Sequence, residues 1–312
     1  MTDRVLIAGQ EGMVGAAIYK IFKKKNFKII DCKRKDLDFT SQILVDSWFK
    51  KNKPDIVINA AGRVGGILDN YRFQADYIYI NTMIGMNVVN ASFRYNVKKL
   101  INLASVCIYP KNVKQPIKET SLLSSGLEIT NEGYALSKIT TLKYCQYLKN
   151  KYKKNFISIL PVNLYGVGDN FNLNSSHVLP ALVKKFVLAK IQNLDKVEVW
   201  GSGKPRREFL NVEDLARGIY FLIKKNLNSD FINIGSGEDL SIRELALIIK
   251  NTIKYKGKII FNKNYPDGVK LRKADTSIIK KLGWSPKIRL RDGIKKYCEY
   301  YQNTVFPEEN LF

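Results

Sequence analysis

Tyr134 and Lys138 stand four residues apart in a segment with helical character, and Ser105 lies upstream at the end of an apolar run. A spacing of four places the two side chains on one face of a helix. There the Lys138 ammonium is expected to lower the pKa of the Tyr134 phenol toward working pH, which makes the phenol a usable acid. Together the three residues predict the chemistry of hydride transfer.

A glycine-punctuated opening precedes these residues. The apolar run at residues 5–8 ends at Gly9, and Gly12 and Gly15 follow at intervals of three, before an amphipathic helix expected from about Val14 to Lys24. Such glycines let a backbone approach a pyrophosphate closely, and the helix N-terminus offers free amides and the positive end of its dipole. An ordinary glycine turn would look alike in isolation, but the strand and helix around it favour a dinucleotide-binding loop.

Further apolar runs at residues 28–30, 55–61, 99–105 and 155–160 alternate with helical segments. This alternation predicts an α/β fold with a Rossmann-type, doubly wound parallel sheet and a smaller C-terminal substrate-binding lobe. Residues 163–166 are expected to form a polar loop at a strand end. We expect residues 1–170 to form the dinucleotide-binding domain and residues 171–312 mainly the lobe, with segments around 210–240 rejoining the first domain. A capping box at Ser241–Glu244 predicts a helix start.

Composition narrows the functional classes. The 312 residues are 45% hydrophobic, and no apolar run is long enough to cross a membrane, which predicts a soluble, cytoplasmic protein. Four well-separated cysteines suggest neither a disulfide framework nor a metal site. Although the formal net charge is +24, the lysines are scattered in pairs and triplets, which favours a solvated surface over nucleic-acid binding.

Eight segments carry a family resemblance: Val64–Ile67, Ser105–Lys111, Gln115–Ile117, Thr130–Ala135, Asn163–Gly166, Asp169–Phe171, Ser176–Val178 and Arg207–Leu210. They are similar to the extended short-chain dehydrogenase/reductases and, within these, to the GDP-L-fucose synthase family of GDP-4-keto-6-deoxymannose 3,5-epimerase/4-reductases. The resemblance extends over nearly the whole chain and implies a GDP-sugar substrate.

By this resemblance, Tyr134 protonates the C4 oxygen, Ser105 orients that oxygen, and Lys138 holds the cofactor ribose. Cys107 and His177, the single histidine of the chain, would act as base and acid at the carbons beside the ketone. Considered without its family context, Cys107 is better explained as a buried structural thiol than as a catalytic one.

The resemblance also implies two sets of binding residues. The cofactor-binding residues would be Gly9, Gly12, Met13, Val14, Gly15, Asp31, Arg34, Ala61, Ser105, Tyr134, Lys138, Pro161, Asn163, Leu164 and His177. The substrate-binding residues would be Asn163, Val178, Leu182, Lys185, Trp200, Arg207 and Arg272. The alternative for Arg207 is a salt bridge to Glu208 or Asp214.

NADPH is the expected cofactor, because the reaction is a reductive step and Arg34 matches a phosphate-binding arginine of the family. NAD stays possible. Glu11 stands where the family usually has an arginine, and Asp31 ends the second strand, where NAD enzymes place a carboxylate for the ribose hydroxyls.

Several alternatives stay open. Four residues depart from the family pattern, namely Arg63, Val106, Gly133 and Leu271. The first alternative is therefore reduction of a GDP-4-keto-heptose without epimerisation. Two further alternatives are more distant. One is an epimerase or dehydratase that retains NAD, and the other is a non-catalytic dinucleotide-binding protein.

A homodimer is expected through the helices Asp76–Phe93 and Asn131–Tyr147. The predicted packed face of the first helix holds Ile80, Ile84, Val88 and Ala91. Packing within one subunit would give the same pattern.

Overall fold

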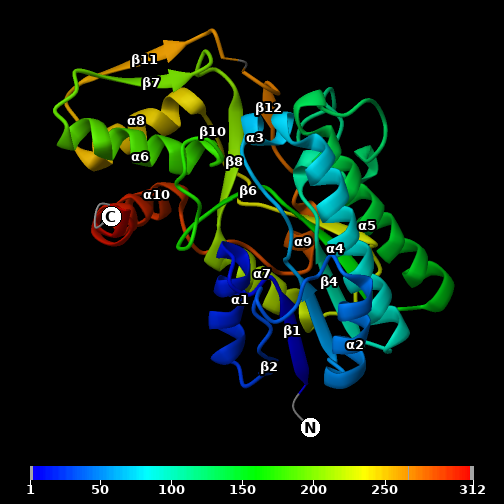
Figure 1. Ribbon diagram of the computed structural model, residues 1–312. Coiled ribbons are helices and arrows are strands. Elements are labelled where there is room, and N and C mark those ends of the chain that lie inside the picture. The colour runs from blue at the N-terminus through cyan, green and yellow to red at the C-terminus, as the bar shows by residue number, and fades with distance from the viewer. Residues whose placement is uncertain (1–2, 266, 310–312) are drawn as a thin grey trace.

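A six-stranded parallel sheet organises the computed structural model, which describes residues 3–265 and 267–309 (Figure 1). The strands lie in the order β2, β1, β3, β4, β5, β9, and all neighbours run parallel. Their bounds are β1 Arg4–Ala8, β2 Lys28–Ile30, β3 Ile56–Asn59, β4 Lys99–Leu103, β5 Phe156–Pro161 and β9 Phe231–Ile234. The predicted Rossmann-type sheet is confirmed.

Helices cover both faces of this sheet, which explains why most positions of its strands are apolar and buried. In β1, Val5 and Ile7 join the core that contains Phe22 of α1, whereas Leu6 and Ala8 join the core on the opposite face. The covering helices are α1 Met13–Lys23 and α7 Val212–Ile223 on one face, and α2 Gln42–Asn52, α4 Gln74–Arg94 and α5 Glu132–Tyr152 on the other.

The long helices α4 and α5 pack side by side and contain the two segments predicted to dimerise. Val88 and Ala91, however, are buried in the core of their own subunit, and Ile84 packs against that core. The predicted dimer face is therefore wrong at these positions, because one apolar stripe of the helix is already used inside the subunit. Among the exposed apolar side chains of α4 are instead Ile78 and Tyr79.

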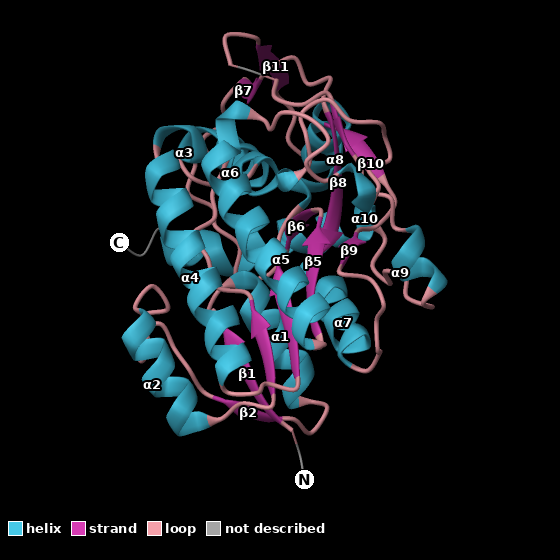
Figure 2. Ribbon diagram, turned by 90° about the vertical axis from the view of Figure 1, so that its right-hand side faces the viewer, coloured by secondary structure: helices cyan, strands magenta, loops and turns pink. Residues whose placement is uncertain are grey.

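The later part of the chain adds smaller sheets. β6 Asn163–Tyr165, β8 Arg206–Asn211, β10 Asp239–Ser241 and β12 Leu271–Arg272 form one of them, and β7 Lys196–Trp200 pairs with β11 Lys258–Asn262. Because Asn163–Tyr165 pairs with β8, the expectation of a polar loop at residues 163–166 is wrong. Figures 1 and 2 show α6 Val178–Ile191, α8 Ile242–Ile253 and α10 Leu290–Tyr300 near these strands.

Short elements complete the described chain. They are α3 Ile67–Arg72, α9 Ser277–Lys281, α11 Phe306–Glu309, a π-helical stretch Tyr301–Val305, and 3₁₀ turns at Val106–Ile108, Glu119–Ser121 and Ile129–Asn131. The capping box is confirmed, since Ser241 Oγ accepts from the Glu244 amide and the Glu244 carboxylate accepts from the Ser241 amide. Within residues 3–265 and 267–309, no helix combines the length and apolar character that crossing a membrane requires.

The chain returns to the large sheet after its excursion into the smaller ones. α7 packs against α1, and β9 then pairs with β5 through Ser158↔Phe231 and the three positions that follow. The large sheet is thus built from residues that lie on both sides of the intervening segment.

Candidate active site

The turn between β1 and α1 is packed too closely for side chains. Gly9 has a φ of +83°, and a Cβ there would lie 2.9 Å from the Ala61 backbone. A Cβ at Gly15 would lie 2.0 Å from the Gly9 carbonyl oxygen. α1 begins at Met13 with no capping side chain at Gly12, so its first amides can meet an anion. This cradle fits the pyrophosphate of a dinucleotide.

Gly15 and Gly12 of this turn should respond differently to alanine. Gly15→Ala pushes a methyl group into backbone that cannot retreat, and it should lower the free energy of unfolding by about 1–3 kcal/mol. At Gly12 the nearest contact of a Cβ is an ordinary 3.5 Å, so Gly12→Ala should stay within about 0.5 kcal/mol of wild type. Urea unfolding of both variants measures this difference, and equal stabilities would contradict the described packing.

Glu11 and Arg34 meet at the far end of the turn. The Arg34 amide donates to a Glu11 carboxylate oxygen at 2.8 Å, and the Cys32 amide donates to the Gln10 side chain at 3.3 Å. Asp31 and the Arg34 side chain are both exposed. The Glu11 carboxylate therefore binds the backbone of the loop after β2 and orders it. This loop is where the choice between NADPH, with its 2′-phosphate, and NADH was expected to be made.

Ser105, Tyr134 and Lys138 come together as their spacing predicted. Ser105 follows β4 and its hydroxyl accepts from the Cys107 amide at 3.1 Å, while it is also hydrogen-bonded to Tyr134. Lys138 Nζ donates to the Leu103 carbonyl at 3.1 Å and lies 5.8 Å from the centre of the Tyr134 ring. The strand end thus supplies one member of the group, and one face of α5 supplies the other two.

The expected lowering of the Tyr134 pKa by Lys138 is wrong. Burial is the main cause that raises the pKa of Tyr134, charge on Cys107 and Tyr77 adds to the rise, and the hydrogen bond from Ser105 opposes it. Burial also lowers the pKa of Lys138 to about 8. At that pKa the ammonium is still mostly charged at pH 7, but burial of the phenol outweighs its effect, so desolvation decides the outcome.

Two arginines, the buried Arg272 and the half-buried Arg207, lie within electrostatic reach of Cys107. Arg272 donates to the Tyr109 and Pro110 carbonyls at 3.0 and 3.2 Å, and Arg207 donates to the Val269 carbonyl at 2.5 Å. Burial first, and then the like charge of Arg272, lowers the pKa of Arg207 to about 10, while Cys107 acts in the opposite direction. Two partly desolvated guanidiniums that repel one another form a site that would gain from an anion.

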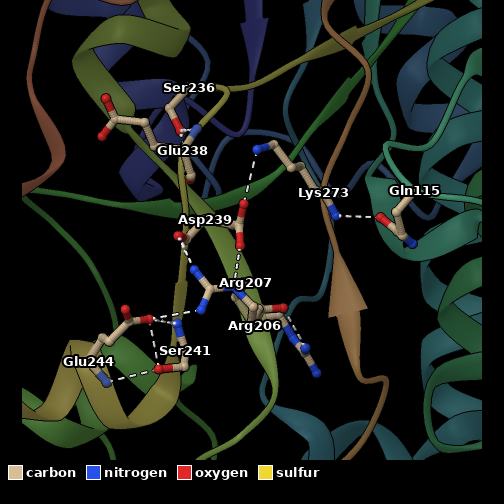
Figure 3. A network of polar contacts seen from close by, with 9 residues as sticks. All are labelled: Gln115, Arg206, Arg207, Ser236, Glu238, Asp239, Ser241, Glu244 and Lys273. Carbon is tan, nitrogen blue, oxygen red and sulfur yellow. Dashed lines mark hydrogen bonds and ion pairs between the residues drawn. The ribbon is translucent and has the colours of Figure 1, made fainter.

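Figure 3 shows that the neighbouring guanidiniums of β8 point to opposite sides of the strand. Arg206 pairs with Asp239 at 2.5 Å and Glu244 at 3.0 Å, whereas Arg207 is directed away from both. The alternative of a salt bridge from Arg207 to Glu208 or Asp214 is wrong. The carboxylates have other partners: Glu208 accepts from the Gly237 and Ala274 amides, and Asp214 pairs with Arg217.

His177 occupies the N-cap position of α6, and its side chain makes no capping hydrogen bond. Its side chain is exposed, yet its surroundings are crowded enough that burial lowers its pKa below the ordinary value. Within the described part of the chain, no hydrogen bond joins His177 to Cys107 or Tyr134, whereas Cys107 lies within electrostatic reach of Tyr134.

The remaining predicted substrate residues form a separate group. The Trp200 ring stacks on Tyr265 at 4.3 Å and 11°, and Lys185 Nζ lies 4.6 Å from the centre of the same ring. Leu182 is buried in the core beneath α6, and Val178 packs against that core. Asn163 Nδ2 donates to the Glu208 carbonyl at 2.9 Å, which ties β6 to β8.

Known proteins are similar to this chain in sequence and in fold. Residues 5–235 match the NAD dependent epimerase/dehydratase family. The chain belongs to this family. A GDP-L-fucose synthase from Sinorhizobium fredii is 44% identical over 302 residues, which cover 97% of this chain and 96% of the relative. The predicted resemblance is thereby confirmed.

Two solved structures are also similar to this epimerase/dehydratase family member. One is a GDP-6-OMe-4-keto-L-xylo-heptose reductase from C. jejuni, with 37% identity, a TM-score of 0.89 and coverage of 96% of this chain and 98% of that one. The other is a GDP-mannoheptose C4 reductase from Campylobacter jejuni with NADP bound, with 37% identity, a TM-score of 0.88 and coverage of 97% and 99%.

Three residues near the site of this family member were missed from the sequence. Tyr77 is fully buried with its ring edge-to-face against Tyr134, Tyr265 stacks on Trp200, and Glu128 acts electrostatically on both Arg207 and Arg272. The helical period could have placed Tyr77 on the buried side of its helix. The other two depend on contacts between distant segments, for which the sequence carries no local signal.

Proposed function

We propose that the protein reduces the C4 ketone of a GDP-4-keto sugar with NADPH and epimerises the sugar at C3 and C5. The observation that carries this proposal is the group formed by Ser105, Tyr134 and Lys138 beside the glycine turn, with Cys107 and the two arginines of the site next to it. The names of the GDP-L-fucose synthase and the GDP-heptose reductases that the chain resembles support the same chemistry.

The cofactor would be held by the cradle of Gly9, Gly12 and Gly15 and by the first amides of α1. NADPH supplies the hydride when it is bound. Tyr134 then donates its phenolic proton to the C4 oxygen, which Ser105 orients through its hydroxyl. The raised pKa of Tyr134 suits this role, because the phenol keeps its proton at neutral pH until the oxygen beside it gains charge.

Epimerisation would use Cys107 and His177, which remove and return protons at the carbons beside the ketone. The lowered pKa of His177 keeps its imidazole neutral at pH 7, where it can accept a proton. Arg207 and Arg272 would bind the diphosphate, and Trp200 with Lys185 would contact the nucleoside end. Asn163 would contact the sugar or its phosphate.

Arg34 is expected to decide between the two dinucleotides. Its exposed guanidinium can reach the 2′-phosphate of NADPH, whereas Glu11 is engaged by the Arg34 amide. Arg34→Ala should therefore lower kcat/KM for NADPH about tenfold, the effect of roughly 1.4 kcal/mol, with little change for NADH. Steady-state kinetics with both donors measure this. Equal losses for the two donors would assign Arg34 to the loop and not to the phosphate.

The proposed function is tested by NADPH oxidation with GDP-4-keto-6-deoxymannose in deuterium oxide, with NADH as a parallel donor and products examined by mass spectrometry and NMR. Oxidation with deuterium at C3 and C5 supports reduction with epimerisation. No oxidation with this sugar or with a GDP-4-keto-heptose would overturn the proposal.

Reduction of a GDP-4-keto-heptose without epimerisation is the second candidate. It is favoured by the likeness to two solved structures of GDP-heptose reductases, one of which has NADP bound. Oxidation of NADPH without deuterium incorporation identifies this reaction, since Cys107 and His177 would then be present but unused.

We further propose a cytoplasmic homodimer. Four free cysteines suit a reducing compartment. α4 and α5 pack together, and each has exposed apolar side chains, among them Tyr79 on α4 and Leu136 and Tyr147 on α5. Light scattering should give twice the chain mass, and Tyr79→Glu should reduce it to one chain. A wild-type mass near one chain would contradict the dimer.

A further inference from the structure

The segment from Gly65 to Tyr77, here termed the bridge segment, is fastened to the loop that carries His177. The Gly66 amide donates to the Ser175 carbonyl at 2.8 Å, and a Cβ at Gly66 would lie 2.3 Å from the Ser176 carbonyl oxygen. Only a glycine allows this approach. Any shift of Gly66 must therefore be transmitted to the residues immediately before His177.

Asn70 holds Gly66 in place from inside the bridge segment. It is 6% exposed, and its Nδ2 donates to the carbonyls of Gly65 and Gly66 at 2.7 and 3.0 Å. Two hydrogen bonds from one buried amide fix both peptide groups that face the His177 loop. Because Asn70 lies in α3, the loop that carries His177 is anchored to a helix and not only to another loop.

The other end of the bridge segment contacts Tyr134. The Tyr77 ring meets the Tyr134 ring at 6.2 Å and 81°, an edge-to-face arrangement. The Tyr77 hydroxyl donates to Asp69 at 2.5 Å, next to Asn70 in the chain. A Cβ at Gly65 would lie 2.3 Å from that hydroxyl, so the hydroxyl also packs against the backbone that Asn70 holds.

A third contact fixes the start of the Tyr134 helix. Gln74 Oε1 accepts from the Gly133 amide at 3.0 Å, and its Nε2 donates to the Ile129 carbonyl at 3.0 Å. A Cβ at Gly133 would lie 2.5 Å from the Gln74 carbonyl oxygen. The bridge segment is thus joined by close backbone contacts to both of the elements that carry His177 and Tyr134.

We propose that Asn70 and Tyr77 are positioning residues, which act through the bridge segment to fix His177 relative to Tyr134 and thereby set the balance between proton exchange beside the ketone and reduction of the ketone. This inference rests on the proposed function. His177 and Tyr134 must address neighbouring carbons of one sugar ring, and no direct hydrogen bond between them maintains their separation in the described chain. A misplacement of about 1 Å can cost a catalytic group roughly 100-fold in rate.

The test compares Tyr77→Phe and Asn70→Asp with wild type. Tyr77→Phe keeps the ring against Tyr134 but removes the hydroxyl that binds Asp69. Asn70→Asp is nearly isosteric but cannot donate to the two carbonyls. Tyr95→Phe is the matched control, because Tyr95 donates to Asp46 at 2.9 Å in the same type of bond at a place outside the site.

Two readouts are measured on each protein. The first is the rate of deuterium incorporation divided by the rate of NADPH oxidation, which a general loss of folded protein does not change. The second is the NMR titration of the His177 imidazole in the free protein, made without a histidine tag. The chain has one histidine, so its signals need no assignment.

Both bridge variants should lower the exchange-to-reduction ratio about tenfold and move the His177 titration toward the ordinary pKa, since a loosened loop is more hydrated. Tyr95→Phe should change neither. A ratio and a titration that stay at wild-type values in Tyr77→Phe and Asn70→Asp overturn the inference. If wild type oxidises no NADPH, the proposed function fails, and if it incorporates no deuterium, epimerisation fails. The titration still decides the positioning role in either case.

Discussion

Tyr134→Phe is expected to lower kcat for NADPH oxidation by about 10²–10⁴-fold, the contribution of a positioned general acid. The variant keeps the ring against Tyr77 and removes only the hydroxyl that is hydrogen-bonded to Ser105. Without it, the C4 oxygen must take its proton from water in a buried site. Binding of NADPH, followed by fluorescence titration, should change little, because the glycine turn is untouched.

Tyr144→Phe is the matched control for this prediction. Tyr144 lies on the same helix and donates to Asn90 at 2.9 Å. Its substitution removes a hydroxyl from α5 without changing the proposed site, and the variant should keep its activity. Activity of Tyr134→Phe above a tenth of wild type would mean that another group protonates the oxygen.

Cys107→Ser and His177→Asn should each lower deuterium incorporation at the carbons beside the ketone by about 10²–10⁴-fold, because each removes a proton-transfer group. Reduction of a GDP-4-keto sugar that needs no epimerisation should persist in both. Mass spectrometry of products formed in deuterium oxide measures the exchange. Persistent incorporation in either variant would remove that residue from the proposed mechanism.

The pH dependence of this exchange follows from the lowered pKa of His177. Where His177 removes a proton, its imidazole must be neutral, so exchange through this step should fall when the pH drops below a value that is itself below the ordinary 6.5. Well above that value the imidazole is neutral, and proton removal by His177 changes no further with pH. Cys145→Ala is the matched control for Cys107→Ser. Cys145 also carries a free thiol, but it is buried in a hydrophobic core and is distant from Cys107 in the sequence.

The sequence allowed the large sheet to be predicted, because its strands are short, apolar and separated by helices. Lys28–Ile30 was predicted with its observed bounds. At residues 163–166 the prediction of a loop was wrong, since the polar side chain of Asn163 obscured a strand that is stabilised by pairing with β8. Pairing with a strand that lies far along the chain leaves no signal in the local amino-acid composition.

The relative placement of the site residues was predictable where a single helix or strand determines it. A helical period of 3.6 residues brings Tyr134 and Lys138 to one face, whatever surrounds them. The direction of the Tyr134 pKa was not predictable in this way, because it depends on how much of the fold covers the phenol. The hydrogen bond between Glu11 and the Arg34 amide, and the stacking of Trp200 on Tyr265, likewise require the geometry of two loops at once.

The pairing of β9 with β5 has a consequence for synthesis of the protein. Until residue 234 has been made, β5 is an edge strand, and its sequence Phe156–Pro161 is apolar except at Ser158 and is buried at every position in the finished fold. α7, which packs against α1, is also missing from a nascent chain that stops before residue 212. Unpaired apolar edges promote aggregation. Fragments that end near residue 170 should therefore be poorly soluble, and the ribosome must deliver three quarters of the chain before the large sheet can close.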